Sequence, residues 1–257
     1  MPRLARLNVT PVKGTALQHP VEVELGDLGI PTNRRFHLVD DDGALFSGGD
    51  FGPLVQVRAD LETDTQILTC SFPDGTVANG PADDLGEAHV TDFYGRPVPA
   101  RFMYGPFAEA FSTYVGRSVR LVRADRDGDG PDVHRLTLMS LASVADLGAR
   151  GGRRALDPLR FRMNLELEDC APFEEDTWDG RRIRLGTAVL RVRGRVPRCV
   201  VTTQSPRTGL KDFDTLRQIA AYRPLIEEPK GIPFGMYAEV DVPGRAALGD
   251  LVEPLAG

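Results

Sequence analysis

The sequence predicts a β-rich α+β protein, in which many short strands are joined by tight turns and a few helices are added. Three observations support this prediction. The 27 glycines and 20 prolines are spread over all 257 residues, so the segments between turns are short. Partly alternating apolar patterns occur in "RLARLNVTPV" and "VEVELGDLGI" near the start of the chain. Helical periodicity is confined to three stretches, all of them after residue 104.

Two hairpin signals lie in the first hundred residues. The stretch "RFHLVDDDGALFSGG" has a two-residue turn signal at Asp42-Gly43, between apolar runs. The stretch "LTCSFPDGTVANG" has a second turn at residues 73–75, where Pro, Asp and Gly follow one another. Short strands with turns at this spacing indicate a barrel or a sandwich.

The three helical stretches have recognisable ends. "GPFAEAFSTYVG" places aromatic and apolar side chains on one face, begins at Pro106 and stops at Gly116. "MSLASVADLGARGG" has Ser140 in position to act as an N-cap. "DFDTLRQIAAYRP" is closed by Pro224. We therefore expect short helices at these places.

A stretch without apolar periodicity, "RADRDGDGPDVH" at residues 123–134, is the best candidate for a linker. It predicts an N-terminal β-barrel-like domain over residues 1–122 and a second β-rich domain over residues 130–257. Asp125, Asp127 and Asp129 match the first ligand positions of a calcium-binding EF-hand loop. The twelfth position is Leu136 instead of an acid, so we interpret the stretch as a solvated acidic turn.

The composition excludes several classes of protein. A net charge of −6 and a pI near 5.3 argue against nucleic acid as a partner. No apolar run is long enough to span a membrane, and the first residues lack a secretory signal pattern, so we expect no membrane partner. Cys70, Cys170 and Cys199 are too few and too scattered for a disulfide framework or a four-thiolate iron–sulfur cluster. These features predict a cytoplasmic protein.

Arginines are concentrated in the second half of the chain. "LRFRMNLEL" at 159–167 has the period of a strand, and so does "VLRVRGRVPRC" at 189–199. The polar faces of these two predicted strands carry Arg160, Arg162, Asn164 and Glu166 on the first, and Arg191, Arg193 and Arg195 on the second. One interpretation is that these charges pair with acids across a sheet. The other is that some of the arginines hold an anion near Cys199.

Cys199 follows Pro197 and Arg198 in the chain. A lone cysteine is often a small core residue, but a neighbouring cation favours the thiolate, which is the form that acts as nucleophile or soft-metal ligand. The four histidines lack metal-ligand spacing, which argues against zinc.

Taken together, several motifs resemble the MOSC domain, the C-terminal module of molybdenum-cofactor sulfurases. They are "RFRMNLEL", "FEEDTWDGRRIRLGTAVLRV", "RCVVTTQSPRTG" and "PFGMYAEVDVPGRAALGDLV", in that order. In the first half, "NVTPVKG" and "NRRFHLVDDDGALFSG" resemble the β-barrel domain that precedes MOSC in the amidoxime-reducing branch. The resemblance implies that a MOSC β-barrel domain follows an N-terminal β-barrel domain.

The resemblance also implies a set of site residues. Cys199 would be the catalytic residue and the ligand to molybdenum. The implied residues around the molybdopterin are Lys13, Gly14, Arg35 (with Arg34 as the alternative), Asp132 or His134, Arg162, Asn164 and Arg198. Gly14 stands where relatives often have serine, so only its backbone N–H remains as a donor. Because these residues come from both halves, we expect the cofactor to lie between the two domains.

The activity implied by the resemblance is the two-electron reduction of N-hydroxylated, amidoxime-like or related N-oxygenated small molecules. The molybdenum cofactor would carry out the redox chemistry. We expect no iron–sulfur cluster in this chain, so the electrons would come from a separate donor protein. Two alternatives stay open. The protein could be a non-catalytic cofactor carrier or persulfide-transfer module, or it could bind another phosphate-bearing cofactor such as pyridoxal phosphate.

Overall fold

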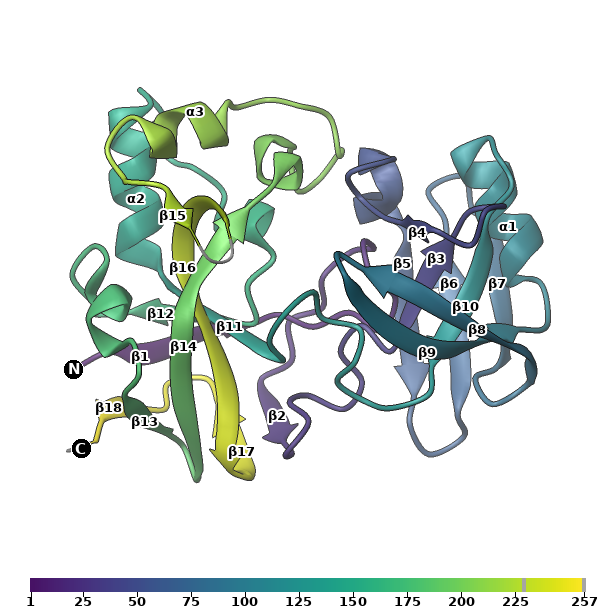
Figure 1. Ribbon diagram of the computed structural model, residues 1–257, viewed down its shortest axis with the longest axis horizontal. Helices are drawn as coiled ribbons and strands as arrows, with labels where there is room; N and C mark the ends of the chain where they lie inside the picture. Colours follow the sequence, from purple (N-terminus) through teal and green to yellow (C-terminus); the bar gives the residue numbers. More distant parts are fainter. Residues whose placement is uncertain (228–229, 256–257) are drawn as a thin grey trace.

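The computed structural model describes residues 1–227 and 230–255 (Figure 1). Eighteen strands and three α-helices are defined among these residues. The strands are β1 (Arg3–Leu7), β2 (Glu22–Leu25), β3 (Phe36–Val39), β4 (Leu45–Phe46), β5 (Arg58–Glu62), β6 (Ile67–Ser71), β7 (Val77–Pro81), β8 (Leu85–Phe93), β9 (Arg96–Met103), β10 (Arg120–Ala124), β11 (Leu136–Ser140), β12 (Leu165–Glu168), β13 (Arg182–Leu185), β14 (Ala188–Arg198), β15 (Ile226–Glu227), β16 (Lys230–Val242), β17 (Gly244–Ala247) and β18 (Val252–Pro254). The helices are α1 (Phe107–Val115), α2 (Leu141–Arg150) and α3 (Thr215–Ala220). The predicted β-rich α+β class is confirmed.

Two groups of sheets form the two halves of the molecule. The largest sheet has the order β1-β12-β11-β16-β14-β13-β18, and β15 pairs with β16. The other half contains a five-stranded sheet, β4-β3-β10-β9-β8, and a three-stranded sheet, β5-β6-β7. Figure 1 shows the two halves side by side, with the long strands β14 and β16 in one and the β8–β9 hairpin in the other.

The N-terminal segment packs with the C-terminal half. Strand β1 pairs with β12, and β2 pairs with β17. Leu4, Leu7 and Ile30 accordingly belong to the core of the large sheet, whereas Phe36 and Leu121 belong to the second core. Whether residues 1–122 and 130–257 are separate domains, as the sequence predicts, stays a prediction. The chain passes to the other half near residue 12, returns for β2, passes over again between Ile30 and Phe36, and returns after β10. Residues of these crossings come close together.

The predicted hairpins and helices are present. β3 pairs with β4 through residues 40–44, a longer connection than the predicted two-residue turn. The Gly43 N–H donates to the Asp40 carbonyl oxygen, and Gly43 is left-handed with a φ of 77°. β6 pairs with β7 around the second predicted turn. The Ser140 side chain accepts a hydrogen bond from the N–H of Ala142 and caps α2, and Gly116 ends α1 in the left-handed conformation.

The predicted strand over residues 159–167 is wrong in its first half. Pro158–Phe161 form a 3-10 helix, begun by Pro158 and by the Asp157 carboxylate, which accepts from the N–H of Leu159. Arg162 then adopts a left-handed conformation with a φ of 53°. Only residues 165–168 form a strand, β12. The alternation that grouped Arg162 with Asn164 on one face therefore does not exist.

The second arginine strand behaves as the charge-pairing interpretation predicts. The arginines at 191, 193 and 195 of β14 lie within 3.3 Å of acidic side chains, those of Asp241, Glu239 and Asp176 respectively. Within the described residues, no helix is long and apolar enough to cross a membrane.

Candidate functional site

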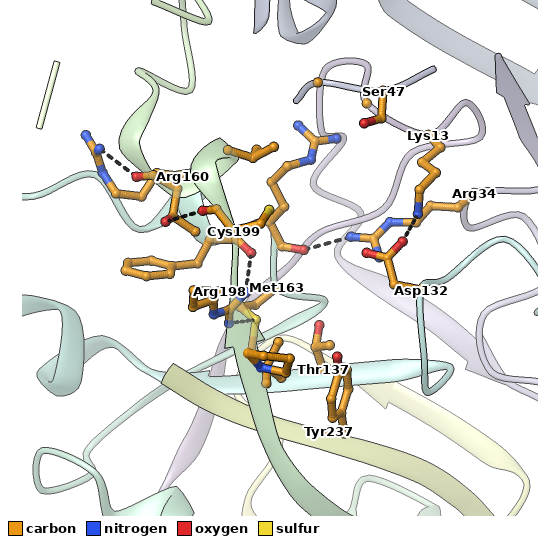
Figure 2. A pocket seen from close by; sticks show the side chains of 18 of the residues that line it. Lys13, Arg34, Ser47, Asp132, Thr137, Arg160, Met163, Arg198, Cys199 and Tyr237 are labelled. Atoms are coloured by element: carbon orange, nitrogen blue, oxygen red, sulfur yellow. Dashed lines mark hydrogen bonds and ion pairs between the residues drawn. The ribbon is translucent and has the colours of Figure 1, made fainter. Parts of the chain in front are cut away.

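A cavity lies between the two halves, and most of the residues predicted for the site line it. Figure 2 shows Lys13, Arg34 and Asp132 on one side and Arg198 and Cys199 on the other. Lys13 lies just after the first crossing, Arg34 lies in the later crossing between Ile30 and Phe36, and Asp132 lies in the segment between β10 and β11. Arg198 and Cys199 lie where β14 ends, so the cavity draws on segments far apart in the chain.

Lys13 is buried at the end of the cavity formed by the N-terminal half. Its Nζ donates to Asp132 Oδ1 (2.6 Å) and to the Gly130 carbonyl oxygen (3.1 Å). Burial lowers the pKa of Lys13, although the Asp132 charge opposes this shift. Burial alone would raise the pKa of Asp132, but the charges of Lys13 and Arg34 outweigh it, and this pKa is lowered. The pair is therefore held as ammonium and carboxylate.

Four arginines line the cavity, and three of them, unlike Arg160, pair with no carboxylate among the described residues. Arg34 donates to the Arg162 carbonyl oxygen (3.0 Å), and Arg162 donates to the Thr15 carbonyl oxygen (2.6 Å). Arg198 donates to the carbonyl oxygens of Phe234 (2.7 Å) and Phe161 (3.1 Å). These bonds fix the side chains in place, but neutral carbonyl groups do not compensate the positive charges.

Burial lowers the pKa of all three arginines. The pKa of Arg162 falls to about 9, through burial first and the Arg34 charge second. The pKa of Arg198 falls to about 10, mainly through burial. None of the three forms an ion pair with an acid of residues 1–227 or 230–255, and Asp132 is the single carboxylate that lines the cavity there. The cavity thus carries an excess of positive charge, which fits a multiply charged anion such as a phosphate ester.

Cys199 lies at the cavity and is exposed, whereas Cys70 is buried. Burial raises the pKa of Cys70 to about 12 and that of Cys170 also to about 12, which makes both poor thiolates. Cys199 precedes a 3-10 helix, Val200–Thr203. The Thr202 hydroxyl donates to the Cys199 carbonyl oxygen (3.0 Å), and the Thr203 hydroxyl donates to that of Val200 (2.7 Å). Both threonines therefore shape the loop that presents the thiol.

Two of the predicted residues do not line the cavity. Arg35 points away and pairs with Asp127 (3.1 Å), because its neighbour Arg34 has a φ of 57° and itself takes the inward position. The alternative residue, Arg34, is therefore the one that the structure brings to the cavity. Asn164 is buried beneath the cavity, where its Oδ1 accepts from the Thr137 hydroxyl (3.1 Å). Asn164 therefore helps to hold Thr137, which lines the cavity.

The other predicted residues are brought together. Gly14 lines the cavity beside Gly48, and its φ of 92° suits the sharp bend after Lys13. His134 also lines it, with Nδ1 lying 2.9 Å from Glu239 Oε1. Both positions named as alternatives, Asp132 and His134, thus face the same cavity.

Sequence reasoning did not identify several lining residues as site residues. They include Ser47, Tyr94, Thr137, Arg160 and Tyr237. Burial raises the pKa of Tyr237 to about 12, so its hydroxyl stays protonated. Ser47 and Tyr94 follow hairpin strands at turns, where exposed polar and aromatic residues are common and give no specific signal. Ser47 and Tyr94 line the cavity only because the two halves of the molecule pack against each other at these turns.

Comparisons with known proteins identify the family and several relatives of the chain. A family model for the MOSC domain matches residues 125–253. Mitochondrial amidoxime reducing component 2 of Rattus norvegicus is 26% identical over 280 residues, which cover 97% of this chain and 82% of that protein. Mitochondrial amidoxime-reducing component 1 of Homo sapiens is 29% identical over 278 residues, again covering 97% and 82%. Among solved structures, the YuaD protein from Bacillus subtilis aligns with a TM-score of 0.48 and 13% identity, over 99% of this chain and 96% of that one.

Proposed function

Because the chain belongs to the MOSC domain family, as its motifs predicted, we propose that it is an oxidoreductase that holds a molybdenum cofactor in this cavity. The proposed reaction is the reduction of N-hydroxylated, amidoxime-like compounds. One observation carries the proposal: three partly buried guanidinium groups without carboxylate partners among the described residues lie beside an exposed thiol. An anionic group that also carries a soft metal needs this combination of donors.

The residues fit the phosphate and the metal of such a group. Lys13, Arg34 and Arg162 would hold the phosphate end, and Arg198 would balance further negative charge. The Cys199 thiolate would be the protein ligand to molybdenum. When bound, the cofactor supplies two-electron redox chemistry, and the protein contributes orientation and electrostatics. The carbonyl-anchored arginines are already oriented, so little side-chain freedom is lost on binding.

The proposed reaction defines what else must reach the cavity. Reduction of an amidoxime to an amidine breaks the N–O bond, consumes two electrons and two protons, and releases water. The electrons would come from a separate donor protein. The Tyr237 hydroxyl, whose pKa is raised to about 12, would serve as a hydrogen-bond donor to bound groups and would stay protonated at neutral pH.

The test is to express the protein in a host that makes the cofactor and to measure bound molybdenum and amidoxime reduction with an artificial electron donor. We expect about one molybdenum per chain at full loading. Cys199→Ala should abolish reduction, whereas Cys170→Ala, which alters a cysteine outside the cavity, should leave it unchanged. Wild-type protein without molybdenum, or an active Cys199→Ala variant, would overturn the proposal.

Two other functions are favoured by single observations. The exposure of Cys199 suits a persulfide carrier, which mass spectrometry would reveal as an added sulfur on Cys199 without redox turnover.

The buried Lys13 amine, whose pKa is lowered, suits a Schiff base with pyridoxal phosphate. Its contact with Asp132 (2.6 Å) favours the ammonium form instead. Visible absorbance that borohydride removes would identify such a Schiff base.

A further inference from the structure

An exposed aromatic residue stands at the rim of the cavity. Tyr94 lines the same cavity as Cys199, yet the residue is 74% exposed. Its hydroxyl has no hydrogen-bond partner within the described part of the chain, so both the ring and the hydroxyl are available to a bound molecule. Neither the proposed metal ligand nor the proposed phosphate site uses this residue.

The turn that carries Tyr94 is tightly defined. Tyr94 and Gly95 are the two turn residues between the paired strands β8 and β9, with φ values of 56° and 91°. Two left-handed residues in succession are the signature of a type I′ hairpin turn. A tyrosine rarely adopts this conformation, and the Gly95 N–H donates to Asp92 Oδ1 (2.9 Å). The ring therefore extends from a fixed backbone.

The base of the same turn is attached to the site. The Phe93 ring is buried, with its centroid 4.9 Å from the Lys13 Nζ. Arg96 Nη2 donates to the carbonyl oxygens of Asp129 (2.7 Å) and Pro131 (2.5 Å). These contacts join the hairpin to the segment that carries Asp132. Figure 1 shows the tip of the β8–β9 hairpin directed toward the other half of the molecule.

We propose that Tyr94 determines substrate specificity by stacking on the planar part of the substrate. This inference rests on the proposed function. A rigid, exposed ring beside the reacting centre favours molecules that carry a flat aromatic group next to the N–O bond. A small aliphatic amidoxime presents the same reacting group without a surface on which Tyr94 can stack.

The test compares benzamidoxime with acetamidoxime, which differ in the group attached to the same amidoxime. The measured quantity is the ratio of their kcat/KM values in molybdenum-loaded protein. Tyr94→Asn removes the ring and keeps a residue that tolerates the left-handed conformation. We expect this variant to lower the ratio by about 3- to 10-fold, mainly through a higher KM for benzamidoxime. Tyr94→Phe should keep the ratio within about 2-fold.

Tyr104→Ala is the matched control, since Tyr104 is 56% exposed but does not line the cavity. It should leave the ratio unchanged, and all variants should bind as much molybdenum as wild type. An unchanged ratio in Tyr94→Asn would overturn the inference while leaving the proposed function standing. If wild-type protein reduces neither compound, the proposed function fails. In that case saturation-transfer NMR measures the binding of benzamidoxime to wild type and to Tyr94→Asn. Loss of the benzamidoxime signal in Tyr94→Asn supports the inference, and an unchanged signal overturns it.

Discussion

Replacing Arg162 by methionine tests whether the positive charge in the cavity is a cost to the fold that a bound anion offsets. Burial, followed by the Arg34 charge, lowers the pKa of Arg162 from the ordinary value of an arginine to about 9. The folded pKa lies below the unfolded one, so from about pH 9 up to the ordinary pKa of an arginine the unfolded chain binds more protons. Stability therefore rises as pH rises through that window, and at pH 7 the whole cost is present.

The size of the cost follows from this pKa. A value of about 9 against the ordinary pKa of an arginine corresponds, at ~1.4 kcal/mol for each tenfold change, to a cost on the order of several kcal/mol. Methionine keeps much of the apolar stem but loses the hydrogen bond to the Thr15 carbonyl oxygen (2.6 Å). Partial contact of the guanidinium with water reduces the gain further. We therefore expect Arg162→Met to raise the free energy of unfolding of the cofactor-free protein by about 1–3 kcal/mol.

Urea unfolding of cofactor-free protein at pH 7 measures this change. Arg160→Met is the matched control, because Arg160 lies two residues away and is buried but pairs with Asp212 (3.1 Å). This control should lose about 1–3 kcal/mol. Arg162→Met should also bind the cofactor at least about tenfold more weakly, since a charge-assisted contact is lost. An Arg162→Met protein that unfolds at lower urea than wild type would refute the reasoning.

Three other perturbations have defined outcomes. Gly130→Ala would place a Cβ 1.7 Å from the Arg34 carbonyl oxygen, so we expect it to lower the melting temperature and the molybdenum content, unlike Gly26→Ala, whose Cβ would meet nothing closer than 3.8 Å. Glu175→Gln should raise the free energy of unfolding by about 1 kcal/mol at pH 7 and should change it little near pH 4. Urea unfolding at the two pH values measures this difference. Burial raises the pKa of Glu175 above 4.5, so its contribution is complete below that pH and is lost as pH rises through the folded value. Thr202→Val removes a 3.0 Å hydrogen bond to the carbonyl of the cavity cysteine and should slow amidoxime reduction with unchanged overall stability; equal activity would show that the loop needs no such support.

Local signals in the sequence were sufficient for the two predicted hairpins and the three helices. The hairpin at Gly43, the Ser140 cap and the end of α1 at Gly116 each depend on contacts within a few residues, and all three are present. The hairpin connection is longer than the predicted two residues. The charge pairing of β14 was also foreseeable, because alternation places its arginines on one face. Local rules failed where the backbone leaves regular structure. At Arg162 the left-handed conformation interrupts an otherwise strand-like pattern.

By itself, the sequence determined which chemical groups are available: an arginine-rich second half, a lone cysteine after a Pro-Arg pair, and ordered motifs that identify the family. The tertiary structure alone decided which groups meet. It turned Arg34 inward instead of Arg35, buried Asn164 as a support, and brought Tyr94 to the rim. The physical reason is that the cavity forms where crossings distant in sequence pass each other, and side-chain direction there depends on single left-handed residues. Neither the packing of these segments nor those φ angles can be predicted from a periodic pattern in the sequence.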